Sequence, residues 1–109
     1  MKHVEYQFSE SDIDTCLFAL AHLHLLDNGE ISDVQMAINE QCAISAAEKL
    51  TRRDEHLTNN EIRVLCCCIT CCNLICQGII SADTETHKEC MKYMFSLNKL
   101  DKNLSSQIF

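Results

Sequence analysis

The chain has 109 residues, of which 47% are hydrophobic and 23% are charged, a composition typical of one globular domain and not of a disordered chain. Its formal net charge is −7, and no group of basic residues is larger than the pair Arg52 and Arg53. Such a chain repels phosphate backbones, so direct nucleic-acid binding is disfavoured.

Residues that form tight turns are scarce, because proline is absent and glycine occurs only at Gly29 and Gly78. Connections between strands depend on such residues, so the composition favours helices. We predict an all-α fold, a compact four-helix bundle in which successive helices are antiparallel neighbours. Residues 1–100 would form the single helical domain, and the polar segment 101–109 would fray.

The first two helices are predicted over residues 9–26 and 32–53, with serine N-caps at Ser9 or Ser11 and at Ser32. On the first helix, His24 shares the apolar face and is expected to be buried. On the second, a stripe of mostly small side chains is expected to pack against another helix: Val34, Ala37, Ile38, Gln41, Ile44, Ser45 and Glu48.

The third helix has the clearest start, because Thr58 and Glu61 have the spacing of a capping box before a long apolar run. It is predicted over residues 59–77. The fourth helix is predicted from the capping residue Asp83 to about residue 97 or 100. Its apolar stripe is expected to comprise His87, Cys90, Met91, Met94 and Leu97.

Residues 64–80 of the third helix carry no charge and include six of the nine cysteines. A helix that is apolar on nearly every side must be covered, either as the central core helix or at a homodimer or larger homo-oligomer interface. The self-association residues would be Cys67, Cys71 and Leu74. A membrane span is disfavoured, because the run is at the lower length limit for crossing a bilayer and interfacial Trp is absent.

The cysteines are predicted to be reduced thiols in a cytoplasmic protein, because no signal peptide is visible and neighbouring cysteines on one helix cannot readily pair. Cys68 and Cys71 with His87 and Cys90 would supply four zinc ligands if the last two helices formed a hairpin. However, C-x-x-C spacing is nearly unavoidable in so cysteine-rich a segment. The main prediction therefore includes no metal and no cofactor.

Several large side chains remain once the apolar stripes are assigned, and these are the candidates for contacts with a partner. They are Phe18, His22, Leu25, Leu26, Tyr93 and Phe95. Whether they form one patch is open at this point.

The sequence carries no nucleophile elbow and no phosphate-binding glycine loop, so we do not expect an enzyme. The predicted function is that of an intracellular interaction module that binds a protein partner. A short acidic helical chain would suit a phage or mobile-element inhibitor of a host or defence protein. The alternatives are a metal or thiol sensor built on the cysteine helix, and a small-ligand carrier formed by an oligomer.

Overall fold

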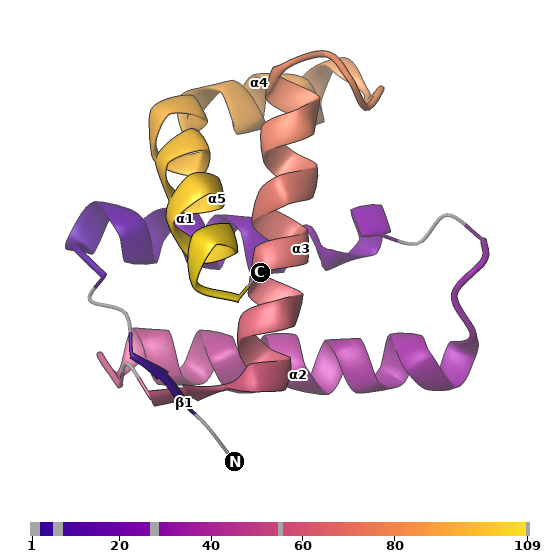
Figure 1. The fold of residues 1–109 in the computed structure, drawn as a ribbon. Coiled ribbons are helices and arrows are strands. Elements are labelled where there is room, and N and C mark those ends of the chain that lie inside the picture. Colours follow the sequence, from indigo (N-terminus) through magenta and orange to yellow (C-terminus); the bar gives the residue numbers. More distant parts are fainter. Residues whose placement is uncertain (1–2, 6–7, 27–28, 55, 109) are drawn as a thin grey trace.

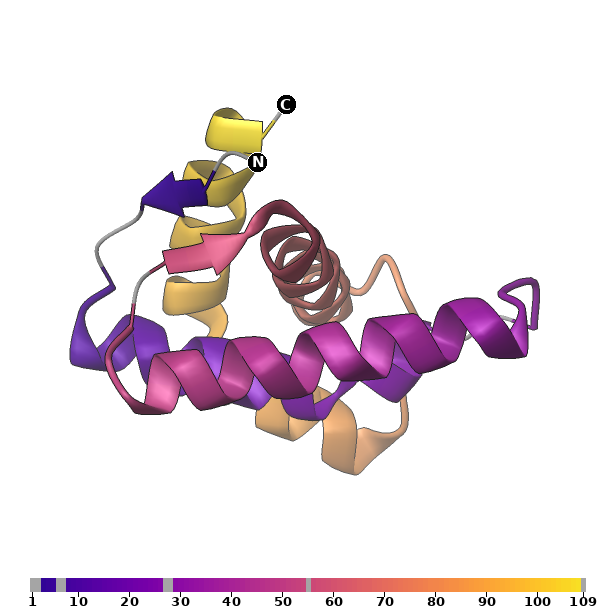
Figure 2. The same ribbon diagram turned by 90° about the horizontal axis from the view of Figure 1, so that it is seen from below.

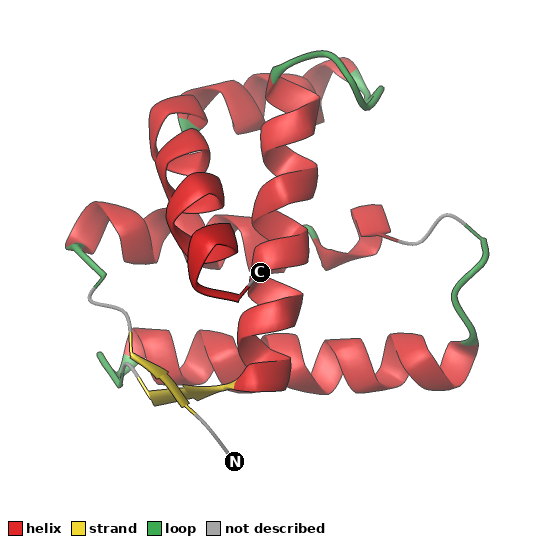
Figure 3. Cartoon of the chain, viewed as in Figure 1, coloured by secondary structure: helices red, strands yellow, loops and turns green. Residues whose placement is uncertain are grey.

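The computed structural model describes residues 3–5, 8–26, 29–54 and 56–108, and within them the regular structure is mainly helical (Figure 3). The helices are α1 (Glu10–Ala21), the 3₁₀ helix η1 (Leu23–Leu26), α2 (Asp33–Thr51), α3 (Asn59–Cys76), α4 (Thr84–Lys92) and α5 (Met94–Ile108). Two short antiparallel strands, β1 (His3–Glu5) and β2 (His56–Thr58), pair with Val4 opposite Leu57. The all-α class is confirmed, with five α-helices in the described residues instead of the four predicted.

Helix α3 is the central element, as predicted, and contacts every other helix and both strands. In Figure 1, α5 returns antiparallel to α3, whereas α1 and α2 lie across it. Figure 2 looks nearly along α3 and shows α2 from the side, which confirms that the two cross. The architecture is therefore two helix pairs that cross each other, instead of a bundle with all its axes aligned.

The helices begin where their capping residues predict. The side chains of Ser9, Ser32, Thr58 and Asp83 each accept a hydrogen bond from a backbone N–H three residues ahead. At Ser9 and Thr58 the bond is reciprocated by an acidic side chain, which completes a capping box. These starts are fixed by neighbours in the sequence, which explains why they were predictable.

The first helix is shorter than predicted, because α1 ends at Ala21 and the chain continues as the 3₁₀ helix η1. The change in winding takes His24 off the inner face and leaves it exposed, while Leu23 is buried. The prediction of a buried His24 is therefore wrong.

Helix α2 packs through the face opposite to the predicted stripe. Its buried residues are Ala43, Ala46 and Leu50. Two small alanines on this side let α2 lie close to α1 and α3, and apolar residues on both sides made the sequence ambiguous. The predicted stripe is instead largely exposed, with Val34 at 72%, Ile38 at 48% and Ile44 at 53%.

The predicted fourth helix is divided at Tyr93, the C-cap of α4. The break resets the helical phase, so the buried stripe of α5 is Leu97, Leu100 and Leu104. Of the predicted stripe, Cys90 and Leu97 are buried, whereas His87 and Met91 are exposed. Helix α5 is helical to Ile108, through most of the segment for which fraying was expected; Phe109 lies outside the described residues.

Two of the polar side chains on α3 are explained by a single carboxylate on α5. Asp101 accepts hydrogen bonds from Thr70 Oγ1 at 2.5 Å and from Asn73 Nδ2 at 3.1 Å. Asn73 is buried, so without this partner its amide would incur a desolvation cost. The pair of bonds fixes how α5 lies along α3.

The last turns of α5 should contribute strongly to stability, because Leu104 is only 1% exposed. We expect Leu104→Ala to lower the free energy of unfolding by about 2–5 kcal/mol, the range for a buried leucine truncated to alanine. Chemical denaturation would measure it. Lys102→Ala, at an exposed position two residues away on the other side of the helix, should have little effect; equal effects of the two variants would contradict the packing of this helix.

Candidate functional site

Three of the residues predicted to contact a partner form one aromatic cluster. The ring of Phe18 on α1 stacks on Tyr93 at a centroid distance of 4.3 Å and an interplanar angle of 20°. His22 lies 4.4 Å from Phe18 and shares a hydrogen bond between its Nδ1 and the Phe18 carbonyl oxygen. All three side chains are half-buried, so the cluster holds α1 against the junction of α4 and α5.

Phe95 lies two residues beyond this cluster and is 85% exposed, although it is a large aromatic side chain. It borders a groove of about 300 Å³ between α1 and the α4–α5 junction, hereafter the Phe95 groove. The Thr15 hydroxyl donates to Ser96 Oγ at 2.8 Å across the groove and so joins its two walls. The lining residues are Ser11, Asp14, Thr15, Lys92, Tyr93, Phe95 and Ser96.

The other two predicted contact residues, Leu25 and Leu26, lie on η1 and are partly buried against the core. They do not line the Phe95 groove. Of the six candidates, the structure therefore brings together Phe18, His22 and Tyr93, places Phe95 beside Tyr93, and uses both leucines chiefly for packing.

The predicted self-association residues of α3 are placed differently from one another. Cys67 is exposed and Leu74 is half-buried, whereas Cys71 is buried. Only a narrow strip of α3 therefore reaches solvent, and Arg63 and Thr70 interrupt it. Most of the helix is covered within the chain.

The four candidate zinc ligands do not form a metal site. Cys68, Cys71 and Cys90 are buried, but His87 is exposed. Among the described residues, no three His, Cys, Asp or Glu side chains are grouped so that they could hold a metal ion. Cys90 instead contacts Cys72, which is not one of the four.

Burial lowers the acidity of the thiols in the core. It raises the pKa of Cys66 and of Cys68 to about 12, and it raises the pKa of Cys16 and of Cys72 still further above the usual range. A thiol must lose its proton to act as a nucleophile. These cysteines are therefore packing residues at neutral pH.

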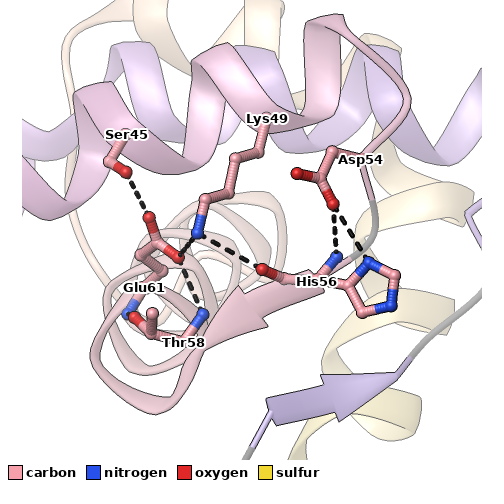
Figure 4. A network of polar contacts seen from close by, with 6 residues as sticks. All are labelled: Ser45, Lys49, Asp54, His56, Thr58 and Glu61. Carbon is pink, nitrogen blue, oxygen red and sulfur yellow. Dashed lines mark hydrogen bonds and ion pairs between the residues drawn. The ribbon is translucent and has the colours of Figure 1, made fainter.

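A network of polar side chains, which the sequence did not predict, joins α2 to the start of α3. Figure 4 shows Glu61 at its centre, with Lys49 Nζ 2.8 Å from Glu61 Oε1 and the Ser45 hydroxyl donating to the other carboxylate oxygen. Lys49 also donates to the His56 carbonyl oxygen at 3.2 Å. The capping-box glutamate thus ties α2 and β2 to α3.

The Ser45–Glu61 contact superficially resembles a nucleophile beside a base. Burial alone would raise the pKa of Glu61, but hydrogen bonds from Lys49, Ser45 and the backbone of Thr58 outweigh it and lower the pKa below the ordinary value. A general base needs a pKa near the working pH, so this carboxylate is too weak a base to activate a serine. The network is suited to holding helices together.

Two further grooves border α2. One, of about 510 Å³, lies against α1 and η1 and combines apolar side chains with Asp33 and Glu40. The other, of about 420 Å³, lies beside Cys42 and Glu61. Carboxylates on both make them unsuited to anionic ligands such as nucleotides. None of the helices in the described part of the chain is long and apolar enough to span a membrane.

Comparisons of the chain with protein-family models, with curated proteins and with solved structures find no match. The interpretation of these surfaces therefore depends on the chain's own residues.

The Glu61 network should make the free energy of unfolding depend on pH in the acid range. Folding lowers the pKa of Glu61 below its ordinary value of 4.5. The ionised Glu61 therefore contributes fully to the free energy of unfolding at a pH above 4.5, and this contribution is lost as the pH falls through the pKa of the folded protein. Lys49→Met should lower the free energy of unfolding at neutral pH by about 1–3 kcal/mol. It should also move the onset of acid destabilisation to higher pH.

Denaturation at a series of pH values measures both effects. Glu10→Gln is the matched control, because Glu10 forms its 2.6 Å ion pair with Arg53 at the surface. If the free energy of unfolding of Lys49→Met varied with pH in parallel with that of the wild type, the ion pair would not set the pKa of Glu61.

The burial of the thiols predicts their reactivity. Of the nine cysteines, all within the described residues, Cys67 is exposed, Cys42 and Cys76 are half-buried and the other six are buried. A chromogenic thiol reagent should therefore modify one thiol rapidly in the native protein and all nine after unfolding. Cys67→Ala should remove the fast phase, and a fast phase that survived this substitution would show that the buried thiols are accessible.

Proposed function

We propose that this chain is a non-enzymatic interaction module that binds a protein partner through the Phe95 groove. The observation that carries the proposal is the 85% exposure of Phe95 at a well-packed corner of the fold. Aromatic side chains are enriched at the centres of protein interfaces, and an isolated exposed phenylalanine has no role in the core.

The surroundings of Phe95 suit it to act as an anchor. Tyr93 is held by its stack on Phe18, and the Thr15–Ser96 hydrogen bond fixes the two walls of the groove. A side chain presented from a rigid corner loses little conformational entropy when a partner covers it. The partner would supply an apolar pocket for the Phe95 ring.

Polar groups surround this anchor. Lys92 is paired with Glu89 at 3.2 Å, and Asp14 and Ser11 lie on the opposite wall. A polar rim around an apolar centre is the usual composition of a non-obligate interface. The net charge of −7 favours a partner whose contacting surface is neutral or basic and disfavours nucleic acid.

A small-ligand carrier is the second candidate, because the groove between α2 and η1 has a volume within the range of small-molecule sites. Its carboxylates would select a neutral or cationic ligand. Mass spectrometry of any small molecule released on denaturation would test this function independently of Phe95.

The partner hypothesis predicts that contacts in the cell depend on Phe95. A photo-crosslinking phenylalanine analogue at position 95 should form a covalent adduct with a distinct protein in the producing cells. The same analogue at Ile79, which is 67% exposed on the loop between α3 and α4, is the matched control. Identical adducts from the two positions would contradict the proposal.

The purified adduct partner then permits a quantitative test. Phe95→Ala should weaken its binding at least about tenfold, the effect of losing 1.4 kcal/mol at an interface centre. The same substitution should change the free energy of unfolding by less than about 0.5 kcal/mol, because the side chain is exposed. Unchanged affinity would exclude Phe95 as the anchor.

A further inference from the structure

The side chains of Cys72 on α3 and Cys90 on α4 lie against each other in the core. A hydrogen bond links the two thiols, which are 1% and 0% exposed. Neighbouring cysteines within α3 point to different sides of one helix and cannot readily pair. Cys72 and Cys90 differ from them, because they come from two helices and face each other.

Helix α4 is held to the core largely through this contact. Cys90 is the only buried residue of α4, every residue of which is described. The helix packs mainly on α3, at the end of α3 that is remote from α2 (Figure 1). A short helix with so little buried surface opens at a lower free energy than the rest of the core. Local opening of α4 would bring the contact between the two thiols to solvent.

From these observations we infer that Cys72 and Cys90 are a redox pair, which a hydroperoxide converts into a disulfide that fastens α4 to α3. The hydrogen bond holds the two sulfur atoms side by side. Opening and closing of α4 supplies the movement that brings them to the bonding distance of about 2.05 Å. In the reduced protein the same two thiols remain packing residues.

The oxidation takes place in two steps. When α4 opens, the Cys90 thiolate attacks one oxygen of hydrogen peroxide; the O–O bond breaks, Cys90 becomes a sulfenic acid, and the released hydroxide takes up the proton that Cys90 lost. When α4 closes, the Cys72 sulfur attacks the Cys90 sulfur. The S–S bond forms, the S–O bond breaks, and a second water leaves with the proton of Cys72. The two thiols together lose two electrons, and the peroxide gains them.

Burial makes this reaction slow. In the closed fold it raises the pKa of both Cys72 and Cys90, so their thiolates are scarce at neutral pH. Oxidation of the pair therefore waits for α4 to open and is slower than oxidation of the exposed Cys67. The pair would respond to sustained exposure to peroxide and not to a brief pulse.

The disulfide would change the local stability of α4. It closes a loop that contains the α3–α4 connection and most of α4, so it restricts the open state of this helix. Tyr93 follows α4 directly and leads to Phe95. Oxidation would therefore also hold the corner that carries Phe95 more firmly, whether or not a partner binds there.

Mass spectrometry of the full chain tests the inference, with Cys67→Ala introduced to remove the exposed thiol. Folded protein treated with hydrogen peroxide and then unfolded should have two fewer reactive thiols than untreated protein and should have lost the mass of two hydrogen atoms. Trypsin should release peptides 64–88 and 89–92 joined by a bond that a reducing agent breaks. Absence of this joined peptide would overturn the inference.

Substitutions then identify the two sulfur atoms. Cys72→Ala and Cys90→Ala should each abolish the joined peptide. Cys68→Ala and Cys76→Ala, one turn to either side of Cys72, are the matched controls and should retain it. A joined peptide that persisted in Cys72→Ala would assign the bond to another cysteine and overturn the pairing. Circular dichroism shows whether each variant is folded, and Cys72→Ser replaces an alanine variant that is not.

Hydrogen–deuterium exchange tests the fastening of α4. After oxidation, the backbone amides of α4 should exchange at least about tenfold more slowly than in the reduced protein. The amides of α2, which does not pack on α4, should exchange at an unchanged rate. Equal exchange of α4 in the two forms would overturn its fastening by the disulfide.

Discussion

The fold depends on covering most of the surface of α3 with side chains that are themselves small or branched. Cys16 of α1 lies against Cys66, and Cys90 of α4 lies against Cys72. Cysteine packs as a small hydrophobe, so it allows close approach but buries less apolar area than leucine. Helix α3 is therefore stable only when several helices contact it together. This requirement explains why α1 and α2 cross it while α5 runs along it.

A few buried charges fix the directions of those crossings. Glu61 joins α2 to α3, and on the other side Asp12 of α1 forms a 2.9 Å ion pair with Lys99 of α5. Burial would raise the pKa of Asp12, but the bonds from Lys99 and Ser9 outweigh it and lower the pKa. Apolar packing alone tolerates sliding and rotation, whereas an unpaired buried carboxylate is costly. These ion pairs therefore favour one arrangement of the helices among those that apolar packing alone would permit.

What the sequence predicted well was local, and what it missed depended on distant residues. The caps at Ser9 and Thr58 were predictable because both partners lie three residues apart. The division of the last helix was not, because Tyr93 stacks on Phe18, far away in the chain. For the candidate site, the leftover aromatic residues included Phe95, which the structure leaves exposed. They did not reveal that Phe18, His22 and Tyr93 mainly pack together.

The second helix shows most clearly what an apolar stripe can predict. The stripe from Val34 to Glu48 was expected to pack against a neighbouring helix, yet the face that carries Ala43 and Ala46 packs on the rest of the fold instead. Periodicity indicates that a face should be covered without indicating by what.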